Sequence, residues 1–231
     1  MAFGHGSAAR FYYNCTNISK DLEQVDPEFT RDLAEKRPLT SNYVESAPGL
    51  RSLTIALSGL YDAGDASLGT TAWDAFDDGE PHVFAYLPQG DVRDSYGYCG
   101  WANFGSESIT AGDDVVRMPV SVIGSNRFSR AVILHPLRVE ASSSQATAND
   151  NAAASTGMDA YLICTAAAGT ITARVEHSSA GATYNSLGSF TTMTAAGEAT
   201  LVSGVSVNRY VRAAYTVSGS GGTIFVAFAR R

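Results

Sequence analysis

Six acidic residues gather in one short stretch of the chain and are the first candidates for chemistry. They are Asp62, Asp65, Asp74, Asp77, Asp78 and Glu80. Two carboxylates can serve as the acid and the base of glycoside hydrolysis, and a larger set can bind Ca²⁺. Because the spacing fits no EF-hand loop, we interpret the group as the solvated flank of a helix.

A run of aromatic residues could stack on a sugar ring. It consists of Tyr96, Tyr98, Trp101 and Phe104, and Tyr184 is a further candidate nearer the C-terminus. In a regular strand Tyr96 and Tyr98 share one face, whereas Trp101 lies on the other. A protein core or a subunit interface therefore explains the run more simply than a binding platform.

The histidines and cysteines lie too far apart in sequence for a recognised ligand pattern. The histidines are His5, His82, His135 and His177, and the cysteines are Cys15, Cys99 and Cys164. An odd, widely spaced set of cysteines forms no disulfide framework and is typical of buried thiols. No nucleophile elbow, P-loop or dinucleotide fingerprint occurs. We therefore expect no catalytic residues, no cofactor and no metal.

Composition indicates a folded, acidic chain. Of 231 residues, 45% are hydrophobic and 17% are charged, and the formal net charge is −7. Such a charge disfavours a protein that grips nucleic acid by its phosphates. No apolar run approaches the ~20 residues of a membrane helix, so we expect no membrane insertion. The first residues also lack the pattern of a secretory signal.

A change of composition near residue 140 predicts two domains. All seven prolines precede it, and residues 1–140 hold 19 acidic and 11 basic residues against 4 and 5 in residues 141–231. Residues 141–157 are rich in Ala and Ser and contain no aromatic residue, which is typical of a linker. The expected domains are 1–140 and 158–231, joined by that linker.

The segments that carry the candidate side chains are expected to form mainly strands. In 51–59, Leu53, Ile55 and Leu57 alternate with small polar residues, which predicts a half-buried strand. Further strands are predicted over 11–18, 82–87, 96–104, 115–123 and 128–139. Pro119 and Pro136 lie inside two of them, and each implies an edge, a bulge or a strand end.

Two short helices are expected in the N-terminal part. Thr71 can cap the first, with Asp74 three residues later and Gly79 as its stop, and Trp73 and Phe76 would point into a core. The second is predicted near 27–36, because Asp26 precedes a proline and Phe29 and Leu33 lie four residues apart.

The C-terminal part is expected to be a second β-sandwich, Ig-like or jelly-roll-like. Its short strands are predicted over 160–165, 170–177, 187–193, 199–202, 209–217 and 223–229. The Gly-rich segment 218–222 is interpreted as the turn of a hairpin between the last two strands.

Five segments of the N-terminal part follow one another in the order known from one family. They are 17–22, 47–62 (with Pro-Gly-Leu and Leu-Ser-Gly-Leu-Tyr-Asp), 73–79, 82–91 and 128–137. In this order they resemble the major tail tube protein of bacteriophages with long, non-contractile tails. Residues 209–218 and 225–230 look like the accessory sandwich module appended to some members. The implied fold is a tail-tube-like β-sandwich or barrel followed by an outer β-sandwich.

The resemblance implies a structural virion protein without catalytic activity. In the family, subunits form rings, expected to be hexameric, that stack into a tube. The tube forms around a tape-measure protein, meets other tail proteins at its ends, and lets genomic DNA pass. An acidic channel suits that passage, since acids repel phosphate. Loops such as 19–50 and 62–70 would contact the next ring, and the C-terminal domain could contact host-surface glycan.

Two alternatives stay open on the sequence. One is a virion adhesin or carbohydrate-binding β-sandwich protein in which Tyr96, Tyr98, Trp101 or Tyr184 stacks on a sugar. The other is a glycosidase, which would need two carboxylates within about 10 Å of each other across a cleft.

Overall fold

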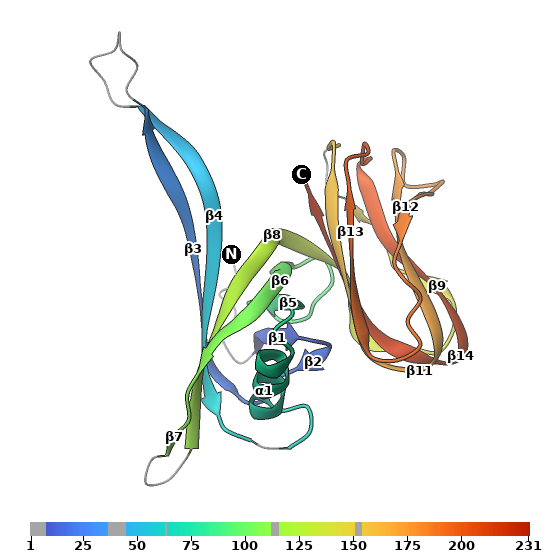
Figure 1. Ribbon diagram of the computed structural model, residues 1–231. Coiled ribbons are helices and arrows are strands. Elements are labelled where there is room, and N and C mark those ends of the chain that lie inside the picture. The colour runs from blue at the N-terminus through green and yellow to red at the C-terminus, as the bar shows by residue number, and fades with distance from the viewer. Residues whose placement is uncertain (1–7, 37–44, 63, 112–115, 151–153) are drawn as a thin grey trace.

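The computed structural model describes residues 8–36, 45–62, 64–111, 116–150 and 154–231, and they form a mainly β structure with one short helix (Figure 1). The mainly β prediction is confirmed. The elements are β1 (Arg10–Tyr13), β2 (Thr16–Asn17), β3 (Leu22–Lys36), β4 (Glu45–Leu60), α1 (Leu68–Asp78), β5 (His82–Leu87), β6 (Tyr96–Glu107), β7 (Thr110–Ala111), β8 (Val116–Glu140), β9 (Ser144–Gln145), β10 (Asn149–Asp150), β11 (Met158–Ser178), β12 (Asn185–Ser189), β13 (Gly197–Ser203) and β14 (Tyr210–Arg230).

One continuous antiparallel sheet runs through the chain in the order β12-β11-β14-β8-β6-β5-β1-β2, and the hairpin β3–β4 joins it through β8. The N-terminal half folds this sheet around an apolar core. From β4, the side chains of Leu53, Ile55 and Leu57 are buried in that core, which confirms the predicted half-buried strand. They meet aromatic residues such as Phe11 and Phe84 from β1 and β5.

The predicted helix near 27–36 is wrong, because this segment lies within β3. Residues of β3 pair with β4 from Leu22↔Gly59 to Lys36↔Glu45. A spacing of four residues, as between Phe29 and Leu33, fits one face of a strand as well as one face of a helix. Pro27 is tolerated because, among the described residues, β3 pairs on one side only and is an edge strand. Most of the expected loop 19–50 is therefore strand.

Helix α1 begins earlier than expected and turns a different face to the core. Ser67, not Thr71, is the N-cap, and its hydroxyl accepts a hydrogen bond from the Thr70 amide, whereas Gly79 ends the helix in a left-handed conformation as predicted. Trp73 and Phe76 are 58% and 54% exposed, so their predicted burial is wrong. The buried face carries small residues instead, including Ala72 and Ala75.

Strand β8 merges two predicted strands and contains both prolines. Pro136 lies where the register with β14 shifts, between Val226↔His135 and Ile224↔Arg138, which confirms a bulge. Pro119 lies just beyond the last residue pair that β8 makes with β6, Glu107↔Val120, and its carbonyl accepts a hydrogen bond from the Ser108 amide. Both prolines thus occupy positions where a ladder donor is dispensable.

The C-terminal half is built from two long strands, β11 and β14, that bend together. Figure 1 shows them curving at the base of this half, so that their two ends form facing layers. The predicted hairpin turn at 218–222 is wrong, because this segment lies inside β14. Gly219 and Gly221 have positive φ angles of 74° and 82°, and the register with β11 shifts opposite them. The glycines bend one strand rather than ending it.

Part of the expected linker 141–157 forms strands. Within it, β9 and β10 both pair with β14. The C-terminal half has its own apolar core, around residues such as Leu162 and Phe228. A third apolar core joins the two halves, because Tyr12, Val83 and Ile133 lie in one cluster with Tyr161 and Phe225. The segment therefore connects two halves that share buried surface.

Candidate subunit-contact surfaces

The face of the β3-β4-β8-β6 sheet that points away from the core carries mostly small polar and acidic side chains. Register places Asp26 opposite Ala56, Ala56 opposite Ser121, and Ser121 opposite Ser106. The hydroxyls of Ser106 and Ser121 lie 2.8 Å apart. Asp26, Ala56 and Ser106 are exposed, so this row lies on the solvent side of the sheet.

The same pattern continues in the neighbouring rows, with one apolar exception. Glu28 pairs with Thr54, Thr54 pairs with Ile123, and Ile123 is 48% exposed. Arg117, near the start of β8, forms an ion pair with Glu23. We name this surface the polar sheet face. It carries two carboxylates among small polar side chains and is defined by Gln24, Asp26, Glu28, Thr30, Ser52, Thr54, Ala56, Ser58, Ser106 and Ser121.

The hairpin β3–β4 leaves one sheet edge open and extends beyond the body of the molecule. Among the described residues, β3 pairs with β4 alone, and β4 pairs with β8 only over Thr54–Leu60. The outer parts of both strands pair only with each other and form the arm that projects from the body in Figure 1. A strand rises by ~3.3 Å per residue, so residues 31–36 give this arm a length of about 20 Å. The β7–β8 hairpin projects at the opposite end.

An aromatic groove lined by arginines lies between β3 and the strands β6 and β8. The ring centroid of Phe29 lies 4.7 Å from that of Tyr98 and 5.9 Å from that of Phe128. The guanidinium of Arg51 lies 5.4 Å from the Phe128 centroid. The groove has a volume of about 390 Å³ and is lined by Phe29, Thr30, Arg31, Arg51, Tyr98, Phe128 and Arg130.

The candidate aromatic residues are not assembled into one platform. Tyr98 lines the aromatic groove, and Tyr96 stacks under Arg130, with 4.3 Å between the guanidinium and the ring centroid. Trp101 lies in a different pocket, beside Arg127 and Asp159, and Phe104 is buried in a core. Tyr184 contacts Arg212, 3.8 Å from the ring centroid, in the C-terminal half. The prediction that Tyr98 and Trp101 point to opposite faces is confirmed by the cores that they join.

The acidic candidates are all exposed and lie on α1 or in the segments beside it. Asp74, Asp77 and Glu80 are exposed on or beside α1. Asp78 contacts His82, and Asp62 lies 4.0 Å from Lys20. Within the described residues, no group of three or more His, Cys, Asp or Glu side chains could hold a metal ion. In the same part of the chain, no helix is long and apolar enough to span a membrane.

The described histidines serve as hydrogen-bond partners within and between elements. His135 contacts Glu140 at 3.0 Å, and the Asn208 amide donates to Nδ1 of His177 at 3.0 Å. His82 bridges the two halves, with Nδ1 3.2 Å from Glu198 and Nε2 3.1 Å from Asp78. His5 lies outside the described residues.

The cysteine thiols are poor nucleophiles in this structure. Burial is the largest cause that raises the pKa of Cys15, to about 12, and burial also raises the pKa of Cys99 and of Cys164. All three are free cysteines. A thiol with a raised pKa holds its proton and reacts slowly.

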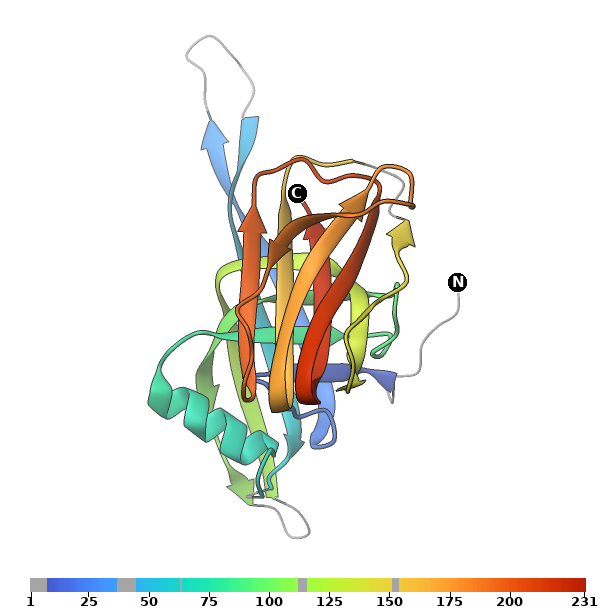
Figure 2. The same ribbon diagram turned by 90° about the vertical axis from the view of Figure 1, so that its right-hand side faces the viewer.

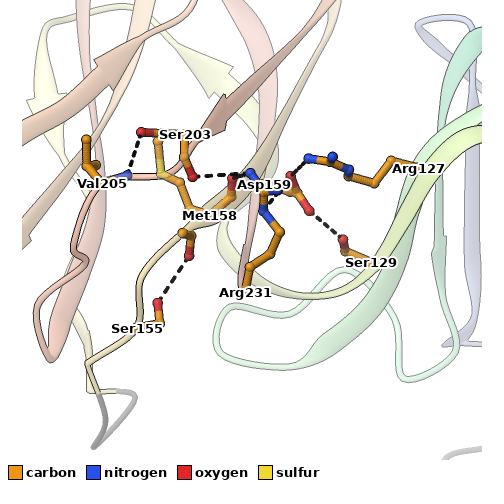
Figure 3. Close-up of polar contacts among 9 residues, drawn as sticks. Arg127, Ser129, Ser155, Met158, Asp159, Ser203, Val205 and Arg231 are labelled. Carbon is orange, nitrogen blue, oxygen red and sulfur yellow. Dashed lines mark hydrogen bonds and ion pairs between the residues drawn. The ribbon is translucent and has the colours of Figure 1, made fainter.

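A buried carboxylate fixes the junction between the halves. Asp159, whose side chain is 2% exposed, contacts Arg127 at 3.2 Å and Arg231 at 3.3 Å. The Ser129 hydroxyl donates to its other oxygen at 2.9 Å. Figure 3 shows Asp159 between the two arginines, with Ser129 on the β8 side. Since a buried charge is stable only when paired, this network positions β11 against β8. No signal in the sequence indicated it.

Comparisons with known proteins found matches among solved structures alone. No protein-family model and no curated protein matches the chain. A chain from the virion of a native gene transfer agent particle is 16% identical, with a TM-score of 0.46, over 55% of this chain and 98% of that chain. A chain of the SPP1 tail tube is 14% identical, with a TM-score of 0.46, over 55% and 78%.

A longer match is the SPP1 Dit protein, described as a hub of the adsorption apparatus. It is 7% identical, with a TM-score of 0.39, and the match covers 96% of this chain and 99% of that chain. Identities and TM-scores at this level describe similarity of fold, so the functional argument below depends on the geometry of this chain.

Proposed function

We propose that this chain is a structural subunit of a virion tail that polymerises as stacked rings, expected to be hexameric, into a tube with an acidic channel. The observation that carries the proposal is the sheet β3-β4-β8-β6, which has one buried apolar face and one polar sheet face and ends at an open edge. An open, regular edge strand is prone to pair with another chain. Neighbouring copies would complete that edge and close the sheets into a ring.

The polar sheet face would line the channel. Its carboxylates, from Asp26 and Glu28, would repel phosphate, and its hydroxyls would keep most of the face polar toward DNA. The projecting arm would contact the next ring on one side. The β7–β8 hairpin, at the opposite end of the molecule, would contact the ring on the other side. The tape-measure protein, other tail proteins at the tube ends and passing DNA would be the partners.

The proposal also covers the predicted domains, the absence of catalysis and the carbohydrate-binding alternative. The domains 1–140 and 158–231 would form the tube wall and an outer module that could contact host-surface glycan. We propose no catalytic role, because the acidic candidates are all exposed on the surface of α1 or of the segments beside it. The carbohydrate-binding alternative named Tyr96, Tyr98, Trp101 or Tyr184 as the stacking residue, and these four lie at separate places on the molecule.

The test is negative-stain electron microscopy of the purified chain, with its mass measured by light scattering over a range of concentrations. Rings or tubes are expected. Tubes of Asp26→Lys/Glu28→Lys should then retain short duplex DNA in a salt-dependent manner, whereas wild-type tubes and a control, Thr191→Lys/Thr192→Lys, should not. A mass of one chain at every concentration would overturn the proposal, and equal DNA retention by all three would overturn the channel assignment.

A further inference from the structure

Helix α1 exposes an aromatic pair within an acidic surface. The rings of Trp73 and Phe76 lie 6.4 Å apart, and more than half of each side chain is exposed. Asp74 and Asp77 flank them and are exposed as well. Two large exposed aromatic side chains on one short helix are typical of an interaction surface. We name Trp73, Asp74, Phe76 and Asp77 the helix patch.

The aromatic groove is aromatic and basic, and so complements the acidic helix patch in charge. Three arginines and no carboxylate line it: Arg31, Arg51 and Arg130. Arg51 and Arg130 are exposed and lie over the rings of Phe128 and Tyr96. Within the part of the chain that the structure describes, none of these three arginines forms an ion pair with an acidic residue. Their charge is therefore available to an acidic partner.

The helix patch and the aromatic groove lie on different sides of the molecule. Strand β5 begins at His82, four residues after α1 ends, and Asp78 of α1 contacts His82. Near the other end of β5, Tyr86 stacks with Tyr98 at the groove. Figure 2 shows α1 at one side of the molecule and the following strand running away from it. One copy thus cannot dock its own helix patch in its own groove.

We propose that the helix patch of one copy docks in the aromatic groove of the next copy around a ring. This deepens the proposed function and rests on it. Two different surfaces that recognise each other form a heterologous contact, and repetition of such a contact closes a ring. Trp73 and Phe76 would fill the groove beside Phe29 and Tyr98, and Asp74 and Asp77 would pair with the groove arginines. The groove adjoins β3, so docking would bring the neighbour to the open edge.

Charge reversal tests this contact. Asp74→Arg/Asp77→Arg places arginines against arginines, and Arg51→Glu/Arg130→Glu places acids against acids. Like charges across an interface disfavour association, so we expect each variant alone to need at least about tenfold higher concentration to assemble. A control with two new arginines at exposed C-terminal positions, Thr191→Arg/Thr192→Arg, should assemble like wild type. Circular dichroism melts show which variants are folded.

Mixing the two charge-reversed variants gives the decisive result. In a 1:1 mixture every contact joins opposite charges, so rings of alternating copies should return, and a chain with all four changes should assemble alone. Assembly of the single variants at wild-type concentrations, or no recovery in the mixture and the fourfold variant, would overturn the docking while leaving the proposed function intact. A wild-type chain that never associates would overturn both.

Discussion

At the scale of single residues, His82 makes the contact between the halves depend on pH. The hydrogen bond to Glu198 is the largest cause that raises its pKa, burial opposes it, and Asp78 raises it further. The ring of Tyr13 also lies nearby, at 5.7 Å between centroids. Protonated His82 therefore stabilises the folded chain.

This stabilisation should be fully present below the pKa of histidine in the unfolded chain and lost as the pH rises through the higher pKa of the folded chain. We expect His82→Gln to lower the free energy of unfolding more at about pH 5.5 than at about pH 8.5, measured by urea titration. The comparison needs one variant and two buffers.

His177 provides a control of opposite sign. Burial and Arg230 lower its pKa, so its neutral form stabilises the fold, and that contribution is lost as the pH falls through the pKa of the unfolded chain. His177→Gln should therefore cost more at the higher pH. Equal effects of pH on both variants would contradict the assignment.

At the scale of elements, two glycines turn β14 into a bent strand. A Cβ atom on Gly221 would lie 1.9 Å from the Glu140 carbonyl oxygen, and the φ angle there is +82°. Both the clash and the left-handed backbone disfavour a side chain. We expect Gly221→Ala to lower the free energy of unfolding by at least about 2 kcal/mol, measured by chemical denaturation.

The matched control is Gly204→Ala. A Cβ atom on Gly204 would have no neighbouring atom within 4 Å, so this change should stay within about 0.5 kcal/mol of wild type. A similar loss for both substitutions would show that the bend does not depend on Gly221.

The bend also shows what local sequence can and cannot predict. Alternation in 51–59 identified a strand because one face of β4 is buried and the other is wet. The glycines of 218–222 are compatible with a turn between two strands and with a bend inside one strand. Only the pairing of this segment with β11 shows that it is a bend. The four-residue spacing of Phe29 and Leu33 is likewise compatible with a helix and with a strand, and the pairing with β4 makes the segment a strand.

The contact surfaces were less predictable than the strands. The aromatic groove is assembled from Phe29, Arg51, Tyr98 and Phe128, which belong to four strands. No local spacing relates them. The exposure of Trp73 and Phe76 was missed because a helical period shows which residues share a face, not whether that face meets a core.

At the scale of the whole molecule, each side of residue 140 has a core of its own, and a further apolar cluster is shared between the two sides. Tyr12, Val83 and Ile133 are at most 3% exposed, and they pack against Tyr161 and Phe225 of the C-terminal half. The last part of β8 also pairs with β14. A chain that ends at Glu140 would expose all of this surface to water.

We therefore expect the chain truncated after Glu140 to aggregate or to bind a hydrophobic dye strongly, even though strands β1 to β8 remain. Exposed apolar surface of this kind promotes non-specific association. The variant Val83→Thr/Ile133→Thr should improve the solubility of the truncated chain, whereas in the full chain the same changes should lower the free energy of unfolding by about 2 to 4 kcal/mol, because they bury unpaired hydroxyls. If the truncated chain is soluble, melts cooperatively and forms tubes without these changes, the N-terminal half folds independently and the shared core is dispensable for assembly.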